Sequence, residues 1–165
     1  MSSMLSFKMD AGRFNYRTAG IILHNNKVLL TTVAGLDFWS VPGGRVEHFE
    51  SSTEALKREI KEELNLPCDI KRLLWFTENM FYLDVWGCNV HELAFYYLIS
   101  LPESAAIYNM DSTSCMEQNG AQPVMHDVKW AAVEELHKIN LIPKFLQQGL
   151  LELPETPQHI VFNEL

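Results

Sequence analysis

Three glutamates in residues 59–63 have a spacing that suits metal binding. Glu59, Glu62 and Glu63 stand at positions i, i+3 and i+4 in a run of good helix formers, and this spacing places them on one face of an α-helix. Like charges so spaced repel and destabilise a bare helix. Two interpretations compete: an acidic face solvated by water, or a cluster neutralised by a divalent cation such as Mg²⁺, which prefers oxygen ligands and bridges carboxylates to phosphates.

The residues before this helix favour the metal interpretation. Phe38–Val41 predicts a short strand, and Pro42-Gly43-Gly44 predicts a tight turn, because glycine adopts backbone conformations that other residues rarely adopt. Ser51 with Glu54 three residues later is the pattern of a capping box at a helix start. The expected order is strand, loop and helix, with the loop beside the carboxylates.

Residues 44–66 resemble the signature box of the Nudix hydrolases, the MutT-type pyrophosphohydrolases. The chain reads Gly44-x5-Glu50-x7-Arg58-Glu59-Ile60-x-Glu62-Glu63-x-Asn65-Leu66, and Asn65 stands where the family has glycine. The position after a helix often has a left-handed backbone, which asparagine tolerates. We therefore expect the substitution to leave the chemistry unaffected.

The resemblance implies a role for each matching residue. Glu59, Glu62 and Glu63 match the metal-binding glutamates of the family, and the backbone carbonyl of Gly44 matches a further ligand for Mg²⁺ or Mn²⁺. Glu59 also matches the position that serves as general base in some members, whereas others take the base from a later loop. Arg58 and Glu50 match a pair that orients the site; an ordinary surface ion pair would contribute only about 0–1 kcal/mol.

Residues outside the box supply further candidates for the site. Arg45, beside the glycines, is a candidate for phosphate contact and equally well a solvated surface arginine. Aromatic side chains offer stacking surfaces for a nucleobase, although most such side chains belong to a core. The stacking candidates are Trp39, Phe81, Tyr82 and Trp86. As a fourth carboxylate, serving as metal ligand or base, Glu92 ranks first and Asp127 second.

Length and composition limit the class of protein. A chain of 165 residues, 47% of them hydrophobic and 21% charged, predicts one globular domain over residues 1–165. No apolar run approaches the roughly 20 residues of a membrane helix, and the N-terminal segment lacks the apolar stretch of a signal peptide. Three scattered cysteines favour reduced thiols and a cytoplasmic location over disulfides or zinc.

The net charge of −8 bears on the choice of partner. Long-range repulsion disfavours a nucleic-acid polymer. A small-molecule nucleotide remains compatible, because a metal ion and nearby arginines would supply positive charge locally. The sequence predicts no membrane partner, and it leaves open whether the protein forms a homodimer.

The order of the remaining segments predicts an α/β fold. Thr18–His24 and Lys27–Val33 predict a hairpin around two asparagines, and further strands are expected at 69–78, 91–101, 127–133 and 158–162, with helices at 133–137 and 143–151. Such an order suggests a mixed β-sheet between helices, an α/β/α sandwich, which also resembles the Nudix fold. Residues 102–126 predict a long polar connection, either a lid over the substrate or a disordered loop.

Two functional hypotheses follow. The first is an enzyme that uses Mg²⁺ or Mn²⁺ to hydrolyse the pyrophosphate bond in a nucleoside diphosphate linked to another group. The second is a nucleotide-binding regulatory module on the same fold without turnover, since fold alone does not fix function. The presence of all three metal-type glutamates favours the enzyme. The substrate stays open among ADP-ribose, other nucleotide sugars, nucleoside triphosphates and dinucleoside polyphosphates.

Overall fold

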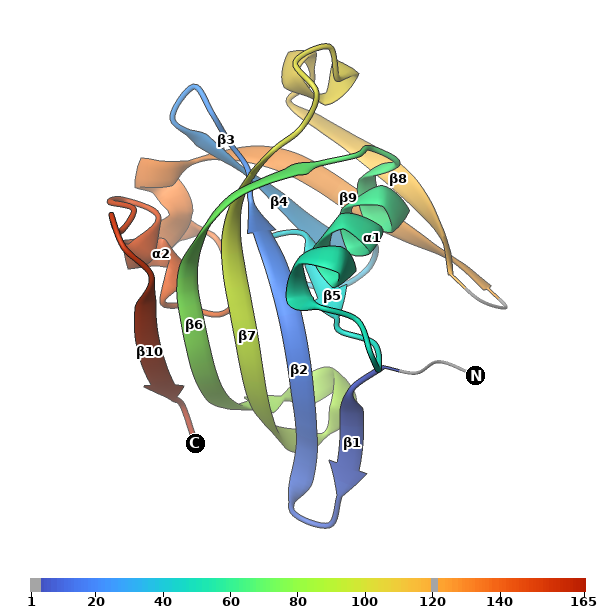
Figure 1. The fold of residues 1–165 in the computed structure, drawn as a ribbon, viewed down its shortest axis with the longest axis vertical. Coiled ribbons are helices and arrows are strands. Elements are labelled where there is room, and N and C mark those ends of the chain that lie inside the picture. The colour runs from blue at the N-terminus through green and yellow to red at the C-terminus, as the bar shows by residue number, and fades with distance from the viewer. Residues whose placement is uncertain (1–3, 120–121) are drawn as a thin grey trace.

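The computed structural model describes residues 4–119 and 122–165, and the strands of this part form two sheets (Figure 1). The first sheet has the order β1 (Ser6–Met9), β2 (Gly12–Ile21), β7 (Cys88–Ser100), β6 (Asp69–Leu83) and β10 (Gln158–Asn163), and β5 (Gly43–Arg45) also pairs with β2. The second has the order β3 (Leu23–His24), β4 (Lys27–Val33), β9 (Gln122–Ala132) and β8 (Ser112–Asn119). Because β2 is parallel to β7 and β10 to β6, while the other pairs are antiparallel, the first sheet is mixed.

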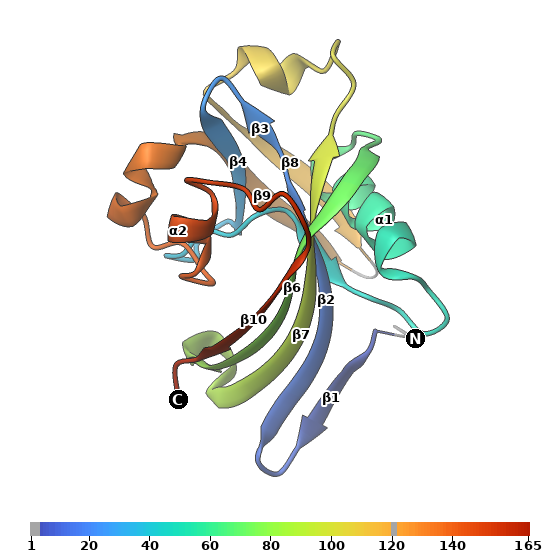
Figure 2. The same ribbon diagram turned by 60° about the vertical axis from the view of Figure 1, so that its left-hand side comes forward.

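Helices lie on both sides of these strands. Helix α1 (Ser52–Leu64) packs on one side, and the 3-10 helix η3 (Val133–Lys138) and helix α2 (Leu146–Gly149) pack on the other (Figure 2). Two hydrophobic clusters fill the layers, one containing Leu56 and Ile60 of α1 and the other Leu136 and Leu146 of η3 and α2. The expected α/β fold with a mixed sheet and few helices is confirmed.

Helix α1 begins and ends as its sequence indicates. The Ser51 side chain accepts a hydrogen bond from the Glu54 N–H, and the Glu54 carboxylate accepts one from the Ser51 N–H. Asn65 ends the helix with φ of 56°, in the left-handed region. Leu56 and Ile60 are fully buried. The predicted capping box and the left-handed end are therefore both present.

The glycine pair differs from its prediction. Gly43 and Gly44 lie in β5, paired with Ala19 and Thr18 of β2, and do not form a tight turn. A Cβ atom on Gly43 would lie 2.3 Å from the Thr18 carbonyl oxygen, and Gly43 has φ of 144°. Glycine is needed here because two backbones approach closely. The expected strand at 38–41 is reduced to isolated bridges at Trp39 and Ser40.

Other boundaries were also predicted incorrectly. The expected connection 102–126 contains the 3-10 helix η2 (Ala106–Asn109), strand β8 and the start of β9, although residues 120–121 lie outside the described part. Strand β6 continues to Leu83 and strand β7 begins at Cys88, so only η1 (Asp84–Trp86) and Gly87 separate the two strands. The expected helices at 133–137 and 143–151 are η3 and the four-residue α2. No described helix has the length and apolar character that crossing a bilayer requires.

Candidate active site

A cleft of about 560 Å³ opens on the first sheet. Its floor carries side chains from β2, β7 and β6, and its walls come from β10, the ends of β4 and β9, and the segments that surround β5. The polar residues lining it include Asn15, Arg17, Arg45, Glu63, Asn79, Glu92, Tyr96 and His126. Charged groups of both signs therefore face one cavity.

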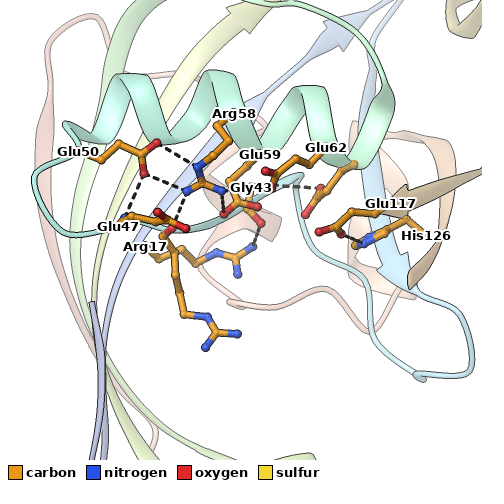
Figure 3. Close-up of polar contacts among 11 residues, drawn as sticks. Arg17, Gly43, Glu47, Glu50, Arg58, Glu59, Glu62, Glu117 and His126 are labelled. Atoms are coloured by element: carbon orange, nitrogen blue, oxygen red, sulfur yellow. Dashed lines mark hydrogen bonds and ion pairs between the residues drawn. The ribbon is translucent and has the colours of Figure 1, made fainter. Parts of the chain in front are cut away.

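Among the glutamates of α1, Glu63 lines this cleft, and Glu59 and Glu62 lie next to it along the helix (Figure 3). Glu59 and Glu63 are each only 6% exposed, while the Glu62 side chain is 31% exposed. The Gly43 N–H donates a hydrogen bond of 3.3 Å to Glu63 Oε2. The helix thus presents two buried carboxylates and one partly exposed carboxylate to the same region.

Arg58 fixes the arrangement of these carboxylates. Its Nε and Nη2 donate to the two carboxylate oxygens of Glu50, at 3.0 and 2.9 Å. Its Nη1 donates to Glu59 at 2.8 Å and to Glu62 at 3.2 Å, and Nη2 also donates to the Arg45 carbonyl oxygen at 3.0 Å. A bidentate arginine–carboxylate pair gives geometric specificity as well as energy. Arg58 therefore joins the loop, β5 and the helix, as Figure 3 shows.

Gly44 lies directly against the Glu59 carboxylate. A Cβ atom at Gly44 would lie 2.2 Å from Glu59 Cδ and 2.3 Å from each carboxylate oxygen. Any side chain at position 44 would displace the carboxylate. The glycine of the box is therefore required by the packing of its own glutamate.

Burial makes the ionised form of the carboxylates unfavourable. Burial raises the pKa of Glu63 to about 8, against the opposing effect of Arg17, and burial likewise raises the pKa of Glu59. Arg17 Nη2 donates to the Gly43 carbonyl oxygen at 3.2 Å, so its guanidinium group lies beside β5. A cation bound between these carboxylates would offset their mutual repulsion.

Glu117 is a further carboxylate of this region, and it was not predicted from the sequence. It lies on β8, is 6% exposed, pairs with His126 of β9, and its charge acts on Glu63. In Figure 3, Glu117 points toward the end of the glutamate cluster. No sequence motif surrounds Glu117, and only the pairing of β8 with β9 brings it near α1.

Of the two further carboxylates proposed from sequence, one lines the cleft. Glu92 lies on the cleft floor near Asn15 and Asn79, and Arg17 interacts with both Glu92 and Glu63. Asp127 accepts a hydrogen bond from Ser114 Oγ at 2.7 Å and does not line the cleft, because its neighbour His126 faces that way.

The other site candidates proposed from sequence are an arginine and four aromatic residues, and all but one of them line the cleft. Arg45, Phe81, Tyr82 and Trp86 line the cleft. The Trp86 ring lies near two guanidinium groups, with Arg13 at 4.8 Å and Arg45 at 5.7 Å from its centroid. Trp39 instead packs its ring against the Lys129 ammonium group, 3.9 Å away, and is not among the cleft residues.

The donor atoms suit a hard divalent cation. The candidates are carboxylate oxygens and the Gly44 carbonyl oxygen, the ligand type that Mg²⁺ and Mn²⁺ prefer. Within residues 4–119 and 122–165, no three His, Cys, Asp or Glu side chains converge closely enough to form a complete metal cage. Mg²⁺ commonly uses one or two protein carboxylates together with waters and substrate phosphates, so the residues present fit such an ion.

The fold and this glutamate-lined helix define a Nudix domain. The family model for the NUDIX domain matches residues 15–149, and the chain belongs to the Nudix family. It is 31% identical to 8-oxo-dGDP phosphatase NUDT18 of Mus musculus over 131 residues, which cover 77% of this chain and 38% of that protein. It is 43% identical to the 8-oxo-dGTP diphosphatase of Buchnera aphidicola over 51 residues, which cover 28% of this chain and 39% of that protein.

A solved structure supports the same fold. The crystal structure of a UDP-X diphosphatase matches 89% of this chain and 66% of its own with a TM-score of 0.58 and 21% identity, a likeness that shows the fold alone. The chain spans between 22% and 39% of the length of the curated relatives that it matches.

Proposed function

We propose that this chain hydrolyses the pyrophosphate bond of a nucleoside diphosphate linked to another group, with Mg²⁺ or Mn²⁺ bound to its helix glutamates. One observation carries the proposal. Glu59 and Glu63 are buried carboxylates of one helix face, held against β5 beside a cleft that also contains arginines. Buried charges are normally paired or coordinate a metal.

We assign a separate role to each group of residues at the site. One or two of the carboxylates of Glu59, Glu62 and Glu63, together with the carbonyl oxygen of Gly44, would hold the ion, which when bound polarises phosphoryl oxygens and lowers the pKa of an attacking water. Glu59 is our candidate for the base that accepts the proton of that water. Arg58 keeps Glu59 and Glu62 in position through its hydrogen bonds.

Positive charge in the cleft supports a phosphorylated substrate. The guanidinium groups of Arg17 and Arg45 both line the cavity. Arginine recognises phosphate through charge-assisted hydrogen bonds. We therefore place the diphosphate between these arginines and the helix glutamates, with the rest of the nucleotide in the cleft.

The names of the relatives guide the choice of compounds. NUDT18 and the Buchnera protein are named for oxidised guanine nucleotides, so nucleoside di- and triphosphates, oxidised forms included, come first in a screen. ADP-ribose, other nucleotide sugars and dinucleoside polyphosphates complete it.

The test is a turnover assay on this panel with Mg²⁺ or Mn²⁺, with products identified by mass. We expect cleavage of at least one compound between phosphates, loss of activity with excess chelator, and recovery when metal is restored. Full turnover in excess chelator would exclude the metal role. Binding without turnover across the whole panel would favour the regulatory module instead.

A further inference from the structure

A buried polar group lies on the cleft floor, apart from the helix glutamates. Glu92 is 8% exposed, and Asn79 and Tyr96 are each 1% exposed, yet all three line the cavity. Asn79 on β6 stands directly opposite Glu92 on β7. The proposed chemistry at the pyrophosphate uses none of these three side chains.

These side chains retain unused hydrogen-bonding capacity. The Tyr96 hydroxyl and the Asn79 carbonyl oxygen are buried without a hydrogen-bond partner, whereas buried polar atoms are normally paired. Burial raises the pKa of the Glu92 carboxylate, against the opposing effects of Arg17 and of the neighbouring Asn15 and Asn79. Since a carboxylate offers about four acceptor positions, it can still accept from a ligand.

The strand register sets the distance from this group to the helix glutamates. Glu92 pairs with Asn15 of β2, and Gly44 pairs with Thr18. Asn15 and Thr18 are three residue steps apart, about 10 Å along the strand, and Arg17 lies on β2 between them. With the diphosphate placed beside Arg17, the nucleoside extends toward Glu92, whose negative charge would repel a phosphate.

The three side chains present one donor and several acceptors. Burial, and next the Glu92 charge, raise the pKa of Tyr96 above its ordinary value, so the hydroxyl keeps its proton and donates. The Glu92 carboxylate and the Asn79 carbonyl oxygen accept. Phe162, paired with Asn79 from β10, also lines the cavity and offers an aromatic surface beside them.

A base that matches this pattern needs a carbonyl acceptor followed by two adjacent N–H donors. Guanine has this edge, made of O6, N1–H and the 2-amino group. Adenine has an acceptor at N1, cytosine has one at N3, and uracil and thymine have a single N–H between two carbonyls. A carboxylate therefore pairs with guanine and meets a lone pair or a carbonyl oxygen on each of the others.

We propose that Glu92, with Asn79 and Tyr96, binds the N1–H and 2-amino edge of a guanine base and selects guanine nucleotides. The inference rests on the proposed function for the placement of the phosphates. Guanine and 8-oxoguanine share this edge, so the subsite selects the base and does not distinguish its oxidation state.

The experiment is calorimetric binding of GMP, IMP and AMP in the presence of Mg²⁺. These monophosphates contain no pyrophosphate bond, so binding is measured apart from turnover. IMP lacks the 2-amino group and AMP also lacks the N1–H. We expect GMP to bind about 10- to 100-fold more tightly than either, the ratio typical of a hydrogen bond to a charged group.

Glu92→Gln should remove most of this preference by weakening GMP binding, with little change for AMP. Glu78→Gln is the matched control, because Glu78 lies on β6 next to Asn79, pairs with His159, and does not line the cavity. Melting temperatures check that both variants fold. The ratio of GMP to IMP affinity is measured in the unmodified protein, so it tests the proposal even if a variant does not fold.

Equal affinity for the three monophosphates, or an unchanged preference in a folded Glu92→Gln protein, would overturn the assignment. A guanine preference without turnover of any pyrophosphate compound would instead contradict the proposed function and leave the base subsite standing.

Discussion

At the scale of single residues, Arg58 determines how the acidic helix face is used. Its guanidinium group holds Glu50, Glu59 and Glu62 at hydrogen-bond distance simultaneously. A lysine has no planar fork and could not make the bidentate bond to Glu50 while reaching the other two. The spacing of glutamates supplies the charges, and Arg58 supplies their orientation.

The helix carboxylates should differ sharply in their effect on catalysis. Glu59→Gln or Glu63→Gln should lower kcat by about two orders of magnitude or more, because positioning and charge stabilisation each contribute several kcal/mol. Glu54→Gln is the matched control, since Glu54 caps the helix away from the cleft and should reduce stability by at most about 1 kcal/mol. Steady-state kinetics on a compound that the protein cleaves give kcat for each variant. Similar kcat values for the Glu59 and Glu63 variants and for Glu54→Gln would refute the assignment of roles.

Glu117 should behave as part of the same cluster. Glu117→Gln removes a buried charge that acts on Glu63, so we expect kcat to fall by about tenfold or more and the metal concentration for half-maximal activity to rise. Asp127→Asn is the control, because Asp127 lies on the neighbouring strand and its carboxylate is hydrogen-bonded to Ser114. If the two variants have the same metal dependence, Glu117 is only a structural partner of His126.

At the scale of elements, the end of α1 can be tested through Asn65. Its backbone is left-handed, with φ of 56°, a conformation that glycine adopts freely and a β-branched residue adopts poorly. Asn65→Gly should be neutral or slightly stabilising, and Asn65→Val should destabilise by about 1–2 kcal/mol. Urea midpoints of both variants provide the measurement. Equal midpoints would show that the left-handed cap contributes nothing to stability.

The elements also show which parts of the site a sequence reveals. Helix α1, its cap at Ser51 and its end at Asn65 depend on neighbours in the chain, so local pattern predicted them. Strand β8 was not predicted, because its polar sequence becomes a strand only by pairing with β9. Glu117 lies on this strand and was therefore not predicted either. Glu92 was predicted as a metal ligand or base, and the structure places it on the cleft floor near Asn15 and Asn79, which the register of three strands brings together.

At the scale of the whole molecule, the buried carboxylates affect stability. In the metal-free protein, burial raises the pKa of Glu63 to about 8 from its ordinary value of 4.5. The folded state therefore holds a proton that the unfolded state releases, so the free energy of unfolding falls as pH rises between these two values. A bound cation, which needs the deprotonated carboxylate, would offset this loss.

Mg²⁺ should therefore raise the melting temperature, and more so at high pH. Ion present at about ten times its Kd contributes about 1.4 kcal/mol, which corresponds to a few degrees for a chain of this size. We expect a larger rise at about pH 8.5 than at about pH 6, because the carboxylates must lose their protons to bind the ion. Differential scanning calorimetry at the two pH values, with and without Mg²⁺, gives the rise in melting temperature at each pH.

Glu63→Gln tests whether this residue is responsible. In the metal-free variant the free energy of unfolding should fall much less between these pH values, and the rise in melting temperature with Mg²⁺ should be smaller. An equal Mg²⁺ effect in both proteins would show that the ion stabilises the fold at a site other than Glu63.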